Sequence, residues 1–318
     1  MGDIKLSVGY SAGRGDLQRL LEASDCLRSV YTGGLAGRIA GGRPQYVSDL
    51  DTLAESVKLA HEKGVEYEIA LNAPCGLEPK SNTTWWQEIR NYLKQLEACG
   101  VDAVIASHPF LMKLVKETTD MKVVASTICE INTVRSALYY EEIGADVIIP
   151  GMNANYDLRT LEAMRLKLKH AGLRIMVNEH CLGDCPWRRF HHNHYAHSSE
   201  ERDYHLQCKT QFFTKPYLFL TNSFIRPEDL GNYVHITRDF KIVGRLVPLQ
   251  DLLARVKAYS EGAYGGNCID LVDSGLAKHF YISNRELDGL FEQKKQCGRL
   301  CDDCRYCIDL CGRLLQYS

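Results

Sequence analysis

A short apolar strand, a turn and an amphipathic helix recur along most of this 318-residue chain. Two steps from helix to strand are nearly identical, Gly100-Val101-Asp102 and Gly144-Ala145-Asp146, where glycine ends a helix and a buried strand follows. Eight strands that alternate with helices predict a (β/α)8 barrel of the TIM type, and a doubly wound open sheet is the alternative. The expected strands are Lys5 to Tyr10, Ser29 to Thr32, Tyr67 to Leu71, Ala103 to Ala106, Lys122 to Ala125, Asp146 to Ile149, Arg174 to Val177 and Phe240 to Val243.

A polar stretch from Glu179 to Lys215 interrupts this alternation between the seventh and eighth strands. Loops that follow barrel strands form the catalytic face, so a long insertion there predicts a functional segment. It carries Cys181 and Cys185 in a C-x3-C pair followed by proline, and Cys208 further on. We expect these three thiols to bind an iron–sulfur cluster. Zinc is the competing metal, and burial as small apolar side chains is the plainer alternative.

The fourth ligand of such a cluster stays open at this level. Cys75, Cys268, a histidine of the insertion or a cysteine of the C-terminal tail could supply it. A cluster without a fourth protein ligand would leave one iron open to a substrate, as a catalytic zinc ion keeps an open position.

Six of the eleven histidines of the chain lie in or next to this insertion, interleaved with Arg188 and Arg189. Histidine titrates near neutral pH, and we expect His191 and His197 to act as a catalytic acid and base. Arg188 is expected to bind a carboxylate or a phosphate. For any one of these residues, a solvated polar loop is an equally simple interpretation. The six histidines are His180, His191, His192, His194, His197 and His205.

Polar side chains also follow several predicted strands. The ends of barrel strands converge on one pocket, so we expect Asn72 and Glu179 to contribute to the site. Other residues of this kind are Ser107, Ser126, Thr127, Asn178 and Asn222.

The tail of the chain contains five of its thirteen cysteines within fifteen positions. This density predicts a second metal or cluster site, because a hydrophobic core does not need so many thiols. Two sets of four compete, since the site could use either the first four or the last four cysteines, and zinc is again an alternative to iron. The five are Cys297, Cys301, Cys304, Cys307 and Cys311.

Bulk properties of the sequence limit the cellular compartment and the partners that we expect. We find no signal peptide and no apolar run of about 18 residues that could span a membrane. The chain is therefore expected in the reducing cytoplasm, where clustered cysteines bind metals more often than they form disulfides. A net charge of −2 calls for no nucleic-acid partner but does not exclude one. The expected division is a barrel over 1–265 and a cysteine-rich extension over 266–318.

With these pieces assembled, the chain resembles peptidase family U-32, the collagenase-like group. Three stretches carry the resemblance: Val30-Tyr-Thr-Gly-Gly34, the step Asn178-Glu-His-Cys181, and Phe240-Lys-Ile-Val-Gly-Arg245. It implies a barrel with a cysteine-ligated 4Fe–4S cluster, in which Cys181, Cys185 and Cys208 look like three ligands. It also implies oxygen-independent hydroxylation, as in relatives that act on ubiquinone precursors or RNA bases with prephenate as the oxygen donor. Other relatives are described as collagenases.

Two departures from the family pattern are visible. Val243 stands where the family's motif has glutamate, and a fourth cysteine expected near residues 227–231 is missing. Both make it harder to transfer a substrate from the family to this chain.

Three functions follow as expectations. The first is an iron–sulfur enzyme that hydroxylates or otherwise redox-modifies a small molecule, RNA or peptide, with an anionic, prephenate-like oxygen donor. The second is a peptidase, for which Cys129 or Cys75 with a histidine of the insertion would supply the nucleophile and base. The third is an iron–sulfur scaffold subunit that works with a partner protein.

Overall fold

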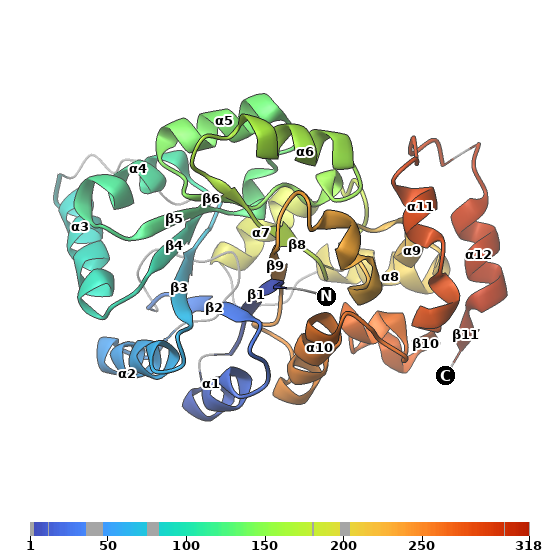
Figure 1. Ribbon diagram of the computed structural model, residues 1–318, viewed down its shortest axis with the longest axis horizontal. Helices are drawn as coiled ribbons and strands as arrows, with labels where there is room; N and C mark the ends of the chain where they lie inside the picture. The colour runs from blue at the N-terminus through green and yellow to red at the C-terminus, as the bar shows by residue number, and fades with distance from the viewer. Residues whose placement is uncertain are drawn as a thin grey trace.

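The computed structural model describes residues 3–11, 13–35, 47–74, 83–179, 181–197, 204–301 and 303–317. Parallel strands form its centre and helices surround them (Figure 1). The sheet order is β7-β6-β5-β4-β3-β2-β1-β9-β8, so that strands β1 to β6 lie side by side in chain order. The strands are β1 (Lys5–Gly9), β2 (Leu27–Gly33), β3 (Glu66–Leu71), β4 (Ala103–Ala106), β5 (Lys122–Ala125), β6 (Val147–Ile148), β7 (Gly172–Leu173), β8 (Ile175–Met176) and β9 (Asp239–Ile242).

The two outer strands of this order, β7 and β8, are halves of one segment separated only by Arg174. β7 pairs with β6 through Ile148 and Leu173, whereas β8 pairs with β9 through Met176 and Lys241. The segment therefore joins the first and last parts of the sheet and closes it into a ring with eight strand positions. The predicted barrel is confirmed, and the open doubly wound sheet is wrong.

Helices cover the outside of the ring, and local sequence sets where they begin and end. Asp49 and Asp157 cap two of them by accepting hydrogen bonds from the backbone N–H of Thr52 at 2.7 Å and Thr160 at 3.0 Å. Gly144 ends another in the left-handed conformation, at φ 113°. The outer helices are α1 (Arg14–Leu21), α2 (Leu50–His61), α3 (Thr83–Ala98), α4 (Pro109–Thr118), α5 (Val134–Ile143), α6 (Leu158–Lys167) and α10 (Leu249–Glu261).

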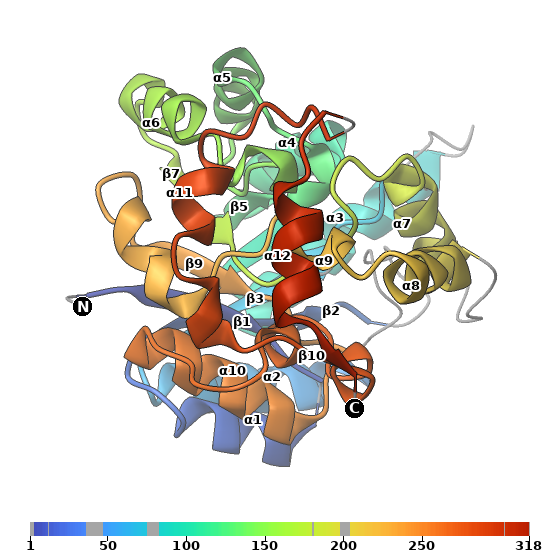
Figure 2. The same cartoon turned by 90° about the vertical axis from the view of Figure 1, so that its right-hand side faces the viewer.

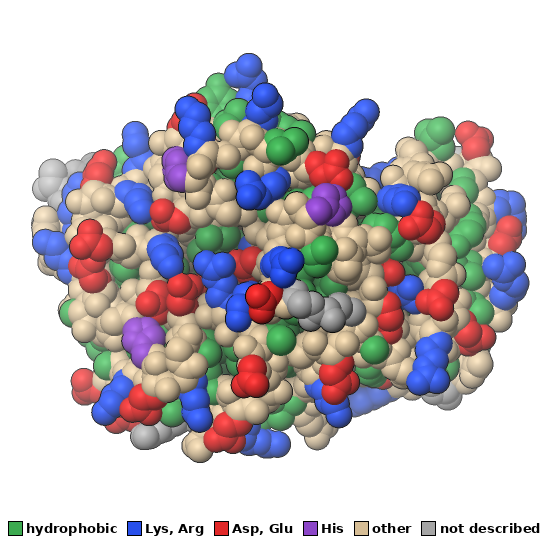
Figure 3. Space-filling view, in the orientation of Figure 1, with side chains coloured by type: hydrophobic (Ala, Val, Ile, Leu, Met, Phe, Trp, Pro, Cys, Tyr) green, Lys and Arg blue, Asp and Glu red, His purple; other side chains and the backbone are tan. Residues whose placement is uncertain are grey.

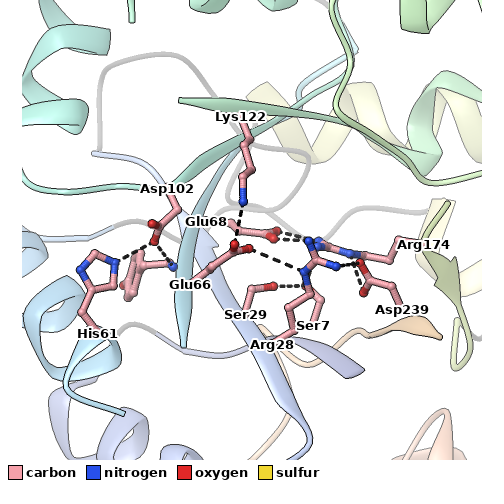
Figure 4. Close-up of polar contacts among 11 residues, drawn as sticks. Ser7, Arg28, Ser29, His61, Glu66, Glu68, Asp102, Lys122, Arg174 and Asp239 are labelled. Carbon is pink, nitrogen blue, oxygen red and sulfur yellow. Dashed lines mark hydrogen bonds and ion pairs between the residues drawn. The ribbon is translucent and has the colours of Figure 1, made fainter. Parts of the chain in front are cut away.

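The barrel interior contains a buried ionic network toward the amino ends of the strands (Figure 4). Arg174 donates from Nη1 to both carboxylate oxygens of Glu68, at 2.8 and 2.9 Å, and from Nε to Asp239 at 3.0 Å. The same Nη1 also lies 3.1 Å from the hydroxyl of Ser7. Arg174 and Glu68 are both about 1% exposed. The network thus ties the strand that closes the ring to β1, β3 and β9.

The insertion, expected as a polar loop, contains helices. These are α7 (Arg188–His197) and α8 (Tyr204–Thr214), followed by α9 (Leu218–Thr221).

Short 3-10 turns lie elsewhere in the barrel, at η1 (Thr127–Cys129), η2 (Met152–Ala154) and η3 (Pro227–Tyr233).

The segment after α10 packs on the flank of the barrel, and α12 lies beside α9 (Figure 2). Phe291 contacts the rings of Tyr156 and Tyr233, with centroids 5.9 and 5.8 Å apart. Arg226 donates to the backbone oxygen of Asn284 at 2.9 Å. The segment and the barrel therefore share one hydrophobic core. Its elements are η4 (Cys268–Leu271), η5 (Leu276–Lys278), β10 (Phe280–Tyr281), η6 (Asn284–Leu287), α11 (Leu290–Lys294), α12 (Tyr306–Leu314) and β11 (Gln316–Tyr317).

The surface mixes charges of both signs on the face that Figure 3 shows, in keeping with the small net charge. Within the described residues, we find no helix with the length and apolar character needed to cross a membrane.

Candidate functional site

A cavity of about 310 Å³ opens at the carboxyl ends of the barrel strands. Strands β2, β3, β5, β8 and β9, or the residues directly after them, contribute to its wall. This is the face on which barrel enzymes carry their catalytic groups. The ionic network around Arg174 lies next to the cavity, closer to the amino ends of the same strands, because Glu68, Arg174 and Asp239 each stand two positions before a cavity residue.

The strand-end residues divide into those that face the cavity and those that hold the backbone. Asn72 and Glu179 line the cavity, as do Ser126 and Thr127. The Asn72 amide donates to the Ser126 hydroxyl at 3.0 Å, which orients both side chains at the mouth.

Asn178 and Ser107 have structural contacts instead. Asn178 accepts a hydrogen bond from the N–H of Val243 at 2.8 Å and donates to the backbone oxygen of Leu271 at 3.1 Å. The Ser107 hydroxyl donates to the carbonyl of Ala73 at 2.6 Å. These two residues therefore fix the loops around the cavity rather than supply groups to it.

Lys241 is a cavity residue that was not predicted. Its ammonium lies 3.7 Å from the centroid of the Tyr31 ring, and Arg245 lies 5.7 Å from the same centroid. Burial lowers the pKa of Lys241 to about 7, although the nearby Glu68 carboxylate opposes the shift. A lysine of this kind can bind an anion when protonated and accept a proton when neutral. The only signal in the sequence was its place in the Phe240–Arg245 stretch, which was used for the family resemblance alone.

Among the described residues of the cavity wall, basic side chains outnumber acidic ones. Lysine and arginine contribute four of these residues and aspartate and glutamate contribute two, without counting His192. The wall therefore favours a ligand with negative charge. The basic residues are Lys209, Lys241, Arg245 and Arg255, and the acidic ones are Glu179 and Asp273.

Cys185 and Cys208 of the insertion form a hydrogen bond, and Cys181 lies within electrostatic range of Cys208. A hydrogen bond from Cys208 lowers the pKa of Cys185 to about 6 and raises that of Cys208. The thiol of Cys181 also acts electrostatically on Cys208. The loop after β8 and helix α8 thus bring together thiols that are 27 positions apart along the chain, at Cys181 and Cys208.

Arg188 lies against these thiols. Arg188 is 7% exposed and donates a hydrogen bond to the backbone oxygen of Leu182 at 2.8 Å. The hydrogen bond between Cys185 and Cys208 and their burial have the largest effects on the pKa values of these two thiols. The positive charge of Arg188 has a smaller effect and lowers both pKa values. Within the described residues its Nε has no hydrogen-bond partner. Arg188 was predicted to bind an anionic ligand, which stays a prediction, and its observed neighbours are the Leu182 backbone oxygen and the sulfur atoms of Cys185 and Cys208.

Two neighbouring histidines of α7 differ in their relation to the cavity. His192 is buried and lines the cavity, whereas His191 is not among the described lining residues. The described part of the chain does not include His180 or Cys75, nor the side chains of His197 and His205. The predicted catalytic pair of His191 and His197 stays a prediction.

Among the tail cysteines, Cys297, Cys301 and Cys304 are exposed, Cys307 is partly buried and Cys311 is buried. Across the described residues, no three or more His, Cys, Asp or Glu side chains converge closely enough to hold a metal ion as they stand. Cys181, Cys185 and Cys208 offer the ligand type of a metal–sulfur centre, and such a centre at these three thiols stays a prediction.

An ion pair connects the two cysteine-rich segments. Asp184, next to Cys185, accepts hydrogen bonds from Nη1 of Arg299 at 2.9 and 3.1 Å. Asn153 also donates to Asp184 at 2.8 Å and accepts from the Arg299 guanidinium through its backbone oxygen. The tail is thereby held against the loop that carries Cys181 and Cys185.

Cys129, suggested as a peptidase nucleophile, is in an unsuitable environment. Burial raises the pKa of its thiol to about 12, and the thiol donates to the backbone oxygen of Ser107 at 3.4 Å. A nucleophilic cysteine needs the opposite shift.

Comparisons with known proteins give a consistent picture. The model of a family described as peptidase family U32 matches residues 23–263. An "Uncharacterized protease MJ1657" of Methanocaldococcus jannaschii is 31% identical over 303 residues, which covers 90% of this chain and 88% of that protein. The solved structure of the U32 peptidase Mk0906 superposes with a TM-score of 0.59 at 18% identity and covers 78% of this chain and 96% of that one.

Proposed function

The chain belongs to peptidase family U32, and from this premise we propose that it is a cytoplasmic iron–sulfur enzyme that modifies an anionic substrate without oxygen. The proposal rests on one observation, the grouping of Cys181, Cys185 and Cys208 beside the buried Arg188 at the mouth of the barrel. Hydroxylation is the reaction class that the family resemblance implies.

Cys181, Cys185 and Cys208 would hold the 4Fe–4S cluster. A cluster with three thiolate ligands carries net negative charge, and Arg188 supplies a buried positive charge beside it. When bound, the cluster would supply electron transfer or an open iron that polarises an oxygen atom. Cys268 is a poor fourth ligand, because it is 3% exposed within the hydrophobic core and lies near Cys311.

The cavity residues would bind and orient the substrate. Lys241 and Arg245 would pair with its negative charge, and Asn72 and Glu179 would fix its orientation by hydrogen bonds. Val243 lines the same cavity at the position where the family motif has glutamate. This chain therefore has one carboxylate fewer at the mouth, which supports an anionic substrate. Near neutral pH, Lys241 exchanges a proton readily, so it could also act as the proton donor or acceptor.

Replacing Cys185 by alanine is expected to remove the cluster. The full-length protein would be purified without oxygen, and iron, sulfide and zinc per chain would be measured alongside the absorption spectrum. Relative to the wild type, Cys185→Ala should lose about four irons and four sulfides per chain. Cys26→Ala is the matched control, since Cys26 is a partly buried thiol on the barrel flank, and it should keep them. Zinc without sulfide in the wild type, or equal iron in both variants, would contradict the proposal.

Peptide hydrolysis is a second candidate, favoured by the names given to the two relatives. The iron-loaded protein and its Cys185→Ala variant would be incubated with gelatin and casein. Hydrolysis that both proteins catalyse at the same rate would support a peptidase that does not need the cluster. Hydrolysis by neither would leave the redox proposal as the better account.

A further inference from the structure

We propose that the tail forms a second metal centre with four thiolate ligands, Cys297, Cys301, Cys304 and Cys307, and that Cys311 is not one of them. The centre would hold either a zinc ion or a 4Fe–4S cluster, since both accept four cysteine thiolates. It does not depend on the proposed centre at the barrel mouth, because the two sets share no residue.

The environment of Cys307 distinguishes this set from the alternative. The charged groups that act on its thiol are Lys294 and the thiols of the three cysteines before it, Cys297, Cys301 and Cys304. Cys307 is the second residue of α12 and is partly buried, whereas the other three are exposed in the segment before the helix. The four thiols therefore lie near the start of the helix, and a bound metal ion would have to draw them together, because they do not converge as they stand.

Cys311 lies one turn further along α12 and belongs to the core. It is 4% exposed, it is part of the main hydrophobic cluster, and its thiol acts on the buried Cys268. Residues four apart share one face of a helix but lie about 6 Å apart along its axis. To ligate the same metal as Cys301 and Cys304, Cys311 would have to leave the core.

The backbone around Cys297 already has the form of a metal-binding turn. Arg299 adopts the left-handed conformation at φ 59°, and its N–H donates to the sulfur of Cys297 at 3.4 Å. The N–H of Cys304 likewise closes a turn onto the backbone oxygen of Leu300 at 3.1 Å. Hydrogen bonds from backbone N–H groups to sulfur orient thiolate ligands and stabilise their negative charge.

Lys294 supplies the positive charge that such a centre needs. Its ammonium lies inside the protein, where it donates to the backbone oxygen of Asn222 and sits 4.1 Å from the centroid of the Tyr156 ring. Both partners are neutral, and the sulfur atoms of Cys307 and Cys297 and the carboxylate of Asp229 lie within electrostatic range of this ammonium. Thiolates on a metal would add negative charge beside the buried ammonium.

The test uses the full-length protein on a Cys185→Ala background, which silences the proposed mouth centre. Metal and sulfide per chain would be compared between this background and the additional changes Cys304→Ala and Cys311→Ala. The background and its Cys311→Ala form should each keep about one zinc, or about four irons with four sulfides. The Cys304→Ala form should lose them. X-ray absorption should find four sulfur neighbours, at about 2.3 Å for zinc.

Two results would overturn the assignment. One is that Cys304→Ala keeps the metal. The other is that Cys311→Ala loses the metal while Cys297→Ala keeps it. Cys297→Ser serves as a second variant should Cys304→Ala fail to fold, as judged by circular dichroism. The two proposals fail separately, because the mouth centre is judged by comparing Cys185→Ala with the wild type, and the tail centre only by changes made on that background.

Discussion

Replacing Arg174 by methionine is expected to lower the free energy of unfolding by about 3 to 5 kcal/mol. The change leaves Glu68 and Asp239 buried without the cation that both of them contact, at 2.8 and 3.0 Å. Two carboxylates confined in the barrel would then repel each other in a medium that screens charge weakly. Urea unfolding followed by circular dichroism at pH 7 would measure the loss.

The loss should depend on pH in a definite direction. Burial already raises the pKa of Asp239 in the wild type, and Arg174 is the first group that opposes this. Without Arg174 the folded-state pKa rises further above the unfolded value. A carboxyl with a raised folded-state pKa destabilises the protein increasingly as pH rises from its unfolded-state pKa to its folded-state pKa. The deficit of Arg174→Met should therefore shrink between pH 7 and pH 5.

Lys122→Met is the matched control for this experiment. It removes an ion pair with Glu66 of similar length, 2.7 Å, but between side chains that are 48% and 29% exposed. Such a pair contributes at most about 1 kcal/mol. A loss in Arg174→Met as small as that of the control, or one that does not change with pH, would show that the buried network is not electrostatically important.

Replacing Lys241 by methionine is expected to stabilise the protein, by up to about 4 kcal/mol at neutral pH. The pKa of Lys241 falls from 10.5 to about 7, and each unit corresponds to about 1.4 kcal/mol of preference for the neutral form. The folded protein therefore binds this proton more weakly than the unfolded chain does. The resulting cost is complete below pH 7, declines as pH rises, and disappears near pH 10.5. Unfolding free energies at pH 6.5, 8.5 and 10 would follow the gain.

The same variant should lose affinity for an anionic ligand of the cavity, because Lys241 is one of the buried basic residues there. Isothermal titration with a dicarboxylate would show this, and Lys122→Met should leave both stability and binding nearly unchanged. Two results would contradict this prediction: a loss of stability in Lys241→Met, or a gain in unfolding free energy that is equal at pH 6.5 and pH 10. Either would show that burial of the charged Lys241 does not destabilise the folded protein.

The barrel could be predicted because its information is local. Apolar strands and the glycine–aspartate steps specify where strands and helices begin, and seven of the expected strands match uninterrupted observed ones closely, such as Ala103–Ala106. The division of the remaining strand at Arg174 could not be predicted in this way. It depends on pairing with β6 on one side and β9 on the other, which exists only after the ring closes.

The candidate site shows the same division between local and tertiary information. Asn72 and Glu179 follow strands directly, and that position was sufficient to place them at the cavity. Lys241 looks like a solvent-facing strand residue until the ring encloses it, and His192 differs from His191 only in which face of α7 it occupies. Composition and the family resemblance were sufficient to predict that Cys181 and Cys208 belong together. That Arg188 lies beside them could be seen only in the fold.

The packing of the C-terminal segment on the barrel has a consequence for the evolution of this family. The family model ends at residue 263, just after α10, whereas Tyr156, Tyr233 and Arg226 of the barrel contact Phe291 and Asn284 beyond it. A relative that lacks the segment must cover or replace this aromatic surface. Substitutions at these three positions should therefore covary with loss of the segment across the family. Aligned sequences alone would then reveal which branch gained or lost the cysteine-rich tail.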